Sequence, residues 1–376
     1  MMYIERQRAS VNFKAGYRFD NGVHLFGDML YSRKDSFSEM AGTPISSSIL
    51  STIWGWPFVP ADHPNNPFGT DLGIAYRTMD AGLRQHDTTA KQYRVTLGLE
   101  GEVGRWDWRA SVLDSDNDYY TQHPNSVLIL DFQDALLGLG GPNHDQYYNP
   151  FGNMPQNDPA VIDGFVTTAF DGGNTLERSL DLAVSTSLGN MPGGPAALAL
   201  GVQWRHQELE EFADEASAKA LIAGRSADYL IPFADRDIGA AYLELSLPVL
   251  KSVEVQLAGR FENYSDFGTT SNPKIALRWQ PLAQLVLRAS WGTSFHAPDF
   301  NDLFQNPVET FGWVIDSPRC ELTGLAEDCD WDMYQMLDQG NPDLQPELGE
   351  SWYAGFNWMP PFAPGLQIAI DYWRYD

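Results

Sequence analysis

Apolar and polar residues alternate along three neighbouring segments in the second half of the chain. Valine, leucine and phenylalanine take most odd positions from Val253 to Phe261, and mostly polar residues take the even positions. The same alternation returns at 273–280 and 285–295. Because successive side chains of a β-strand point to opposite faces, each segment predicts a strand with one apolar and one hydrophilic face. The apolar face must then contact either lipid or a second layer of protein.

The whole chain yields twelve candidate strands, at roughly 8–19, 22–33, 92–100, 105–115, 181–189, 197–209, 238–247, 253–264, 273–280, 285–295, 351–359 and 366–375. Short turns rich in Gly or Pro follow every odd-numbered strand. Most of the other connections are long, at about 34–91, 116–180, 210–237 and 296–350, and 265–272 is the short exception. This alternation predicts an all-β fold, an antiparallel transmembrane β-barrel with short periplasmic turns and long extracellular loops.

Composition supports a barrel and narrows the possible partners. The 376 residues are 43% hydrophobic and 20% charged, so the chain is not disordered. A mean hydropathy of -0.32 and the lack of an 18-residue apolar run exclude transmembrane helices. The net charge of -26 makes nucleic acid a poor partner and is explained by acidic extracellular loops. The first thirty residues show no secretory signal, so we expect a fragment if the protein is exported.

Several motifs, in order along the chain, resemble those of TonB-dependent outer-membrane receptors. They are the runs 259–268, 272–274, 287–291 and 294–304, followed by 341–347 and 351–356. The earlier Asn-Pro-Phe-Gly runs at 66–69 and 149–152 are similar to elements of large receptors in the same superfamily. One residue departs from the pattern: His296 stands where the family usually has Arg in its Phe-x-Ala-Pro turn. An imidazole cannot replace a permanent guanidinium fork, so an ion pair made there in the family is in doubt.

The resemblance implies a barrel of about 22 strands that is closed by an N-terminal plug and lies in the outer membrane of Gram-negative bacteria. Residues 1–376 would form part of that one barrel domain, about 12 of its strands, without the signal peptide, the plug, the TonB box or the closing strands. Expected partners are outer-membrane lipid, the TonB complex through the plug, and a small-molecule ligand. We expect a monomer with no cofactor.

The resemblance also implies an active importer that binds a scarce ligand at its extracellular loops. A ferric chelate such as a siderophore, a cobalamin-like molecule and an oligosaccharide all remain open. Exposed loop aromatics could stack on sugars or on aromatic groups of a chelator. Candidate ligand-binding residues are Trp54, Trp56, Trp313, Arg319, Trp331 and Tyr334.

Charged residues on the polar faces of adjacent strands form a second candidate set. Opposite charges on one sheet face pair readily, so we expect a structural network toward the lumen or plug more than a ligand site. The residues are Arg260, Glu262, Lys274, Arg278 and Arg288.

Cys320 and Cys329 lie nine residues apart in the longest downstream loop. Oxidation during export would join them in a disulfide that closes a small loop. A metal site is the alternative, but two thiols without a nearby His make a poor zinc site. The run Asp114 to Asp118 begins like a calcium loop, yet lacks the Gly and Glu that an EF-hand needs, so a solvated acidic rim is the simpler interpretation.

Catalytic motifs are absent from the sequence. It contains no His-Glu-x-x-His pair, Gly-x-Ser-x-Gly elbow or phosphate loop, so we expect no metal site and no enzyme. Two alternatives to the importer remain. A passive porin is one, and a secreted soluble β-rich protein that binds or cleaves glycans is the other. The soluble protein would bury Leu198, Leu200, Val202 and Trp204 under a second layer, whereas a membrane barrel would show them to lipid.

Overall fold

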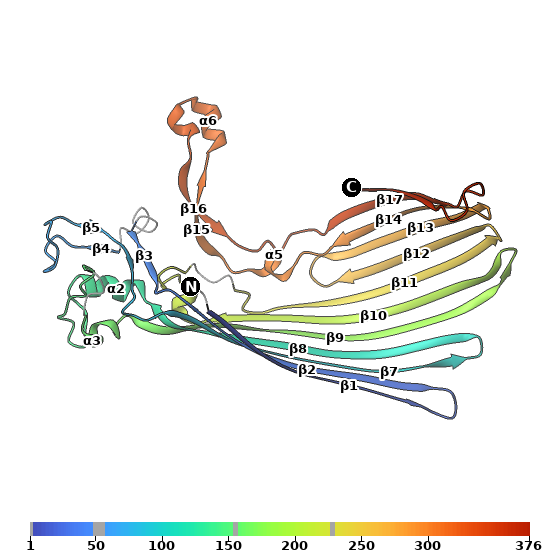
Figure 1. Ribbon diagram of the computed structural model, residues 1–376, viewed down its shortest axis with the longest axis horizontal. Coiled ribbons are helices and arrows are strands. Elements are labelled where there is room, and N and C mark those ends of the chain that lie inside the picture. Colours follow the sequence, from blue (N-terminus) through green and yellow to red (C-terminus); the bar gives the residue numbers. More distant parts are fainter. Residues whose placement is uncertain (1–2, 48–56, 153–156, 226–229) are drawn as a thin grey trace.

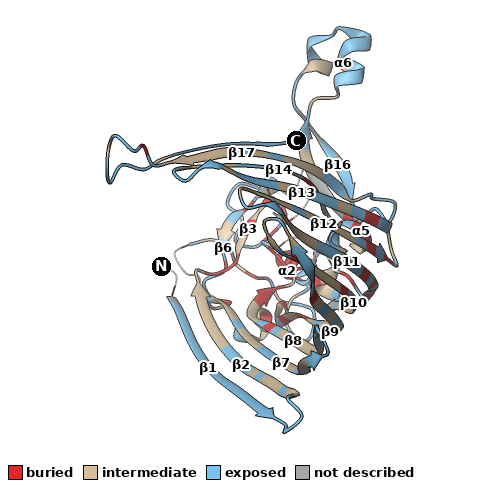
Figure 2. Cartoon of the chain, turned by 90° about the vertical axis from the view of Figure 1, so that its right-hand side faces the viewer, coloured by how far each residue is buried: buried red, intermediate tan, exposed pale blue. Residues whose placement is uncertain are grey.

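A computed structural model of the chain describes residues 3–47, 57–152, 157–225 and 230–376. Its main feature is one curved antiparallel sheet of twelve strands, seen as an open arc in Figure 2. The strands are, in sheet order, β1 (Tyr3–Arg18), β2 (His24–Met40), β7 (Arg84–Val103), β8 (Trp106–Val127), β9 (Val166–Met191), β10 (Gly194–Ala213), β11 (Ala234–Leu250), β12 (Val253–Tyr264), β13 (Gly268–Leu282), β14 (Leu285–His296), β17 (Glu347–Trp358) and β18 (Ile368–Tyr375). The twelve predicted strands are confirmed.

The connections sort by length between the two rims of the sheet (Figure 1). One rim carries short turns, such as 104–105 and 251–252. The other rim carries the long loops 41–83, 128–165, 214–233 and 297–346, with 265–267 as its one tight turn. The long loops contain the remaining elements, which are β3 (Pro44–Ser46), β4 (Phe58–Val59), β5 (Leu72–Gly73), β6 (Ala75–Arg77), α2 (Ile129–Leu136), α3 (Pro159–Ile162), α4 (Glu215–Ala218), α5 (Phe300–Phe304), β15 (Val308–Val314), α6 (Ser317–Thr323), η1 (Ala326–Cys329) and β16 (Asp332–Asp338). None of the described helices has the length and apolar character needed to cross a membrane.

The register separates the two faces of the sheet as the sequence pattern predicts. Apolar residues of neighbouring strands share the outer face, where Val112 stands opposite Leu180 and Leu180 opposite Trp204. Val202 and Trp204 on this face are 51% and 45% exposed, so no second layer of protein covers them. The exposed apolar face fits contact with lipid and not the core of a soluble sandwich.

Two residues beyond Val112, Leu180 and Trp204, toward the long-loop rim, the outer face becomes charged. There Asp114 stands opposite Arg178, Arg178 opposite His206, and His206 opposite Asp237. An ion pair joins Arg178 to Asp114 with 3.0 Å between Nε and Oδ2. Charges on a lipid-facing surface are costly, so this row marks the edge of the apolar band. The strands continue beyond it, which makes β7 to β10 longer than predicted and places Asp114 to Asp118 inside β8.

The apolar core of the chain lies in its loops. Residues of the loops 41–83 and 128–165 pack together into one unit, here called the loop domain, at the left of Figure 1. Its centre is a cluster of three buried rings, Phe132, Tyr148 and Phe165, whose centroids lie 5.2–5.3 Å apart in edge-to-face contacts. Such pairs add to the free energy gained from burying apolar area. The two loops therefore form a folded platform above the rim.

A polar network joins the two halves of the loop domain. The Tyr148 hydroxyl donates to Asp80, 2.8 Å from Oδ1, and the Asn157 amide donates to the same carboxylate at 2.9 Å. Burial, together with Tyr76 and Asp80, raises the pKa of the Tyr148 hydroxyl well above its ordinary value. The hydroxyl thus keeps its proton and remains a donor to Asp80.

A charge placed on the apolar outer face tests the lipid contact. Val112→Arg should destabilise the membrane-inserted sheet by about 1–2 kcal/mol, because Val112 lies within the apolar band but two residues from its charged edge, and the cost of a lipid-facing Arg falls from about 2–4 kcal/mol at the bilayer midplane to about 0–1 kcal/mol near the interface. The adjacent Ser111→Arg is the control, because Ser111 faces the other way and stands opposite Asp181 on β9. The free energy of unfolding in lipid vesicles measures both. Equal effects of the two variants would contradict the assignment of faces.

Removal of the buried hydroxyl tests the loop domain. Tyr148→Phe should lower the local stability of this unit by about 1–2 kcal/mol, because the Asp80 carboxylate loses its closest donor. Amide hydrogen exchange within 128–152 should accelerate, while exchange in the strands stays the same. Tyr147→Phe is the control, since the adjacent Tyr147 is 40% exposed. Unchanged exchange in Tyr148→Phe would mean that the network does not hold the loops together.

Candidate functional site

The feature that stands out from the long-loop rim is a hairpin, here called the arm, which comprises residues 308–338 (Figure 1). β15 and β16 pair along its length, from Val308 opposite Asp338 to Val314 opposite Asp332. α6 and η1 form its tip, where Cys320 and Cys329 are joined in a disulfide. Two paired strands alone are marginally stable in water, so the disulfide stiffens an element that the barrel does not support.

Apolar side chains are exposed on both faces of the arm. Trp313 and Leu337 share one face by register, and each is 61% exposed. Tyr334 and Met336 lie on the opposite face and are also exposed. Trp331, just before β16, is as exposed as Trp313. Large exposed apolar surfaces mark interaction sites. The rings and aliphatic side chains of the arm therefore form a candidate surface for binding a ligand.

The remaining predicted loop residues divide between the tip and the undescribed part of the chain. Arg319 forms an ion pair with Asp328 across the tip, 2.8 Å from Nε to Oδ1. Its guanidinium therefore helps to close the tip, while the side chain stays 62% exposed, and its contact with a ligand stays a prediction. Trp54 and Trp56 lie outside the residues that the structure describes.

The five predicted polar-face residues do share one face, which is the concave face opposite the apolar band. Arg260 donates to Glu262 on its own strand, 2.6 Å from its η2 nitrogen to Oε1, and to Gln203 on β10 at 2.9 Å. Gln203 donates in turn to Asp181 on β9. Arg288 approaches Asp371 at 3.9 Å, and Arg278 donates to Gln280 at 2.9 Å. No ion pair of Lys274 is found among the described residues.

The most buried ion pair among the described residues lies at the rim and involves a residue that sequence analysis missed. Arg236, near the start of β11, is only 6% exposed. Its Nε donates to Asp266 in the 265–267 turn at 2.7 Å, and an η2 nitrogen donates to the Pro298 carbonyl oxygen at 2.8 Å. The guanidinium carbon also lies 4.7 Å from the Phe300 ring centroid, within the range of cation–π contacts. The available signal was the pair of motifs at 259–268 and 294–304, whose acidic and aromatic residues surround this cation.

His296, which replaces the family's usual Arg, takes no part in this clamp. It is exposed at the end of β14, opposite Glu347 on β17. The cation that the rim motifs surround is supplied by β11.

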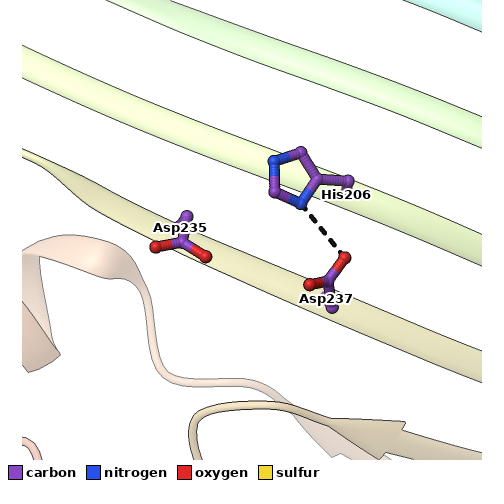
Figure 3. A group of neighbouring side chains, drawn as sticks. All are labelled: His206, Asp235 and Asp237. Carbon is purple, nitrogen blue, oxygen red and sulfur yellow. Dashed lines mark hydrogen bonds and ion pairs between the residues drawn. The ribbon is translucent and has the colours of Figure 1, made fainter.

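A small cluster of acids surrounds His206 on the outer face (Figure 3). Ligand atoms of His206, Asp235 and Asp237 lie within 4.8 Å of one another, which is close enough to hold one metal ion. The imidazole, however, already contacts Asp237 through Nδ1 at 3.1 Å and Glu208 through Nε2 at 2.8 Å. Ion pairing with Asp237 and Glu208 accounts for the position of the imidazole, and the cluster lies on the outer face, opposite the concave face.

Known proteins share this architecture. An alignment of 189 positions is 24% identical between this chain and the vitamin B12 transporter BtuB of Vibrio cholerae, and it covers 46% of this chain and 28% of that protein. The RagAB peptide transporter superposes with a TM-score of 0.55 at 12% identity, over 98% of this chain and 40% of that one. FpvA of Pseudomonas aeruginosa, bound to pyoverdines, superposes with a TM-score of 0.52 at 11% identity, over 99% of this chain and 42% of that one. These two structures share the fold with this chain.

The chain spans about half, or less, of the length of the proteins it matches. The family model described as "TonB dependent receptor-like, beta-barrel" matches residues 36–376, which is most of the chain. Proteins of this family lie in the bacterial outer membrane. The outward apolar band, the polar concave face and the gathering of long loops on one rim agree with that match. The chain therefore belongs to the TonB-dependent receptor-like β-barrel family.

Proposed function

We propose that this chain forms part of an outer-membrane importer that captures a scarce small molecule at its long-loop rim and passes it to the periplasm with energy from TonB. A single observation carries the proposal: one rim holds a folded loop domain and a disulfide-stiffened arm with exposed aromatics on both faces. A passive pore needs no such capture device. TonB would act through a plug that binds the polar concave face.

A ferric chelate is the ligand class that we favour. Trp313, Trp331 and Tyr334 offer ring faces that stack on the aromatic groups of a chelator. The net charge of -26 disfavours a bare anion, whereas a bound metal reduces the negative charge of a chelate. Relatives named for vitamin B12 and for pyoverdine fall in the same range of bulky chelates. A cobalamin-like ligand and an oligosaccharide are the alternatives.

Uptake by whole cells tests the proposal. The gene that encodes this chain is expressed in bacteria with and without a working TonB, and uptake of radioactive iron as ferric catecholate or hydroxamate chelates is measured alongside labelled cobalamin. TonB-dependent accumulation of a ferric chelate is expected. Uptake of cobalamin alone would replace the ferric chelate by a cobalamin as the ligand. Uptake that persists without TonB would indicate a passive porin.

The aromatic arm should decide affinity for the ligand. Replacing both Trp313 and Trp331 by Ala should raise the dissociation constant for the transported chelate about fivefold or more, because each lost stacking contact is worth about 0.5–1.5 kcal/mol. Quenching of intrinsic fluorescence by the chelate measures the constant. Trp279→Leu is the control, since Trp279 lies on the lipid-facing side of β13. Equal affinities in the double variant and the control would remove the arm from the binding site.

The disulfide should stabilise the arm and leave the barrel unaffected. Replacing Cys320 and Cys329 together by Ser should lower the local stability of the arm by about 2–3 kcal/mol, the value expected for closing a loop of this size. Faster amide exchange in 308–338 and easier cleavage by protease are expected, with the same thermal unfolding of the barrel. An arm as protected as before would show that its strands need no covalent support.

A further inference from the structure

The arm is attached to the barrel through a small foot built around α5. Asp299 and Asp302 cap α5 reciprocally, and Leu303 is 2% exposed. The leg that enters the arm is bound to the rim, because the Asn306 amide donates to the Leu230 carbonyl oxygen at 2.9 Å. The leg that leaves it is bound to α5, because the Asn341 amide donates to the Asp302 carbonyl oxygen at 2.7 Å.

The two legs also contact each other closely. The Gly340 amide donates to the Gln305 carbonyl oxygen at 3.0 Å. A Cβ atom at Gly340 would lie 2.6 Å from the backbone carbon of Leu303, which is closer than any side chain allows. The foot is therefore a compact unit, and the direction of the arm follows from where this unit sits on the rim.

The barrel holds the foot through Arg236. The guanidinium joins the Asp266 carboxylate to the Pro298 carbonyl oxygen just ahead of α5, and it lies against the Phe300 ring inside the helix. Tyr264 and Phe267 are also within 5.6 and 5.7 Å of the guanidinium carbon. The Asp266 side chain is only 8% exposed, so water screens this pair weakly. Three rim segments thus meet at one buried cation.

We propose that Arg236 is a positioning residue that fixes the arm, and with it the ligand-contacting aromatics, over the mouth of the barrel. The clamp depends on the shape of guanidinium as well as on its charge. Two donors in a planar fork reach a carboxylate and a carbonyl on different segments at once, while the plane covers an aromatic ring. An ammonium group is a point charge that cannot do all three. The functional importance of the clamp rests on the proposed function, in which the arm captures the ligand.

Exchange at the foot tests this inference without a ligand. In Arg236→Lys the amides of Asn306, Gly340 and Asn341 should exchange about tenfold faster, which is the change expected when one charge-assisted hydrogen bond is lost. The distribution of distances between two spin labels, one at Leu322 on the arm and one at Phe68 on the loop domain, should broaden. The labels are carried on noncanonical residues so that the disulfide stays intact. Thermal unfolding of the barrel should stay the same.

Arg94→Lys is the matched control. Arg94 pairs with Asp28 on the neighbouring strand at 3.3 Å but lies far from the foot. If Arg236→Lys does not fold, Asp266→Asn replaces it, since this variant keeps the Pro298 and Phe300 contacts and should give a smaller change in the same direction. An unchanged distance and unchanged exchange in the variant that folds would overturn the proposal. These measurements use no ligand, so a negative result would reject the clamp and would not bear on import. A negative uptake assay would likewise reject import and would not bear on the clamp.

Discussion

Lipid offers no hydrogen-bonding partner to a peptide group, and this constraint governs the whole chain. Every backbone donor and acceptor within the bilayer must bond inside the protein, which strands achieve only by pairing with neighbours on both sides. The ladder that runs without interruption from β1 to β18 meets this need for the ten strands between its two edge strands. Because the backbone is satisfied by the ladder, the side chains can divide by face: alternate residues contact lipid, and the others line a polar concave surface.

The constraint ends at the long-loop rim, and the character of the structure changes there. On the outer face Val112, Leu180 and Trp204 give way within two residues to Asp114, Arg178 and His206. Beyond this boundary the chain folds as a soluble protein does, with a buried aromatic cluster in the loop domain and a buried ion pair at Arg236. In the proposed function, capture of a ligand belongs to this wet region, while the strands below it provide the wall.

Prediction from sequence succeeded where the lipid imposes a repeating pattern. β12 has the predicted bounds, because alternation continues through its whole length. β9 was predicted as 181–189 but spans Val166–Met191. Its half near the long-loop rim lies outside the apolar band, so it still pairs with its neighbouring strands but does not alternate apolar and polar residues. The loop domain has no periodic signal, since its core joins residues such as Ile45 and Phe165 that are distant in the chain. Arg236 was missed because its partners come from two other segments, so the signal lay in the motifs at 259–268 and 294–304 and not in the sequence around Arg236 itself.

The alternation of lipid and lumen along a single strand is the central claim, and site-by-site accessibility tests it most directly. Spin labels would be placed one at a time from 198 to 205 on β10 of the protein in lipid bilayers. Leu198, Leu200, Val202 and Trp204 should be accessible to oxygen dissolved in lipid. Ala199, Gly201, Gln203 and Arg205 should be accessible to a water-soluble nickel chelate instead. Accessibility without a period of two would contradict the assignment of this sheet as a barrel wall.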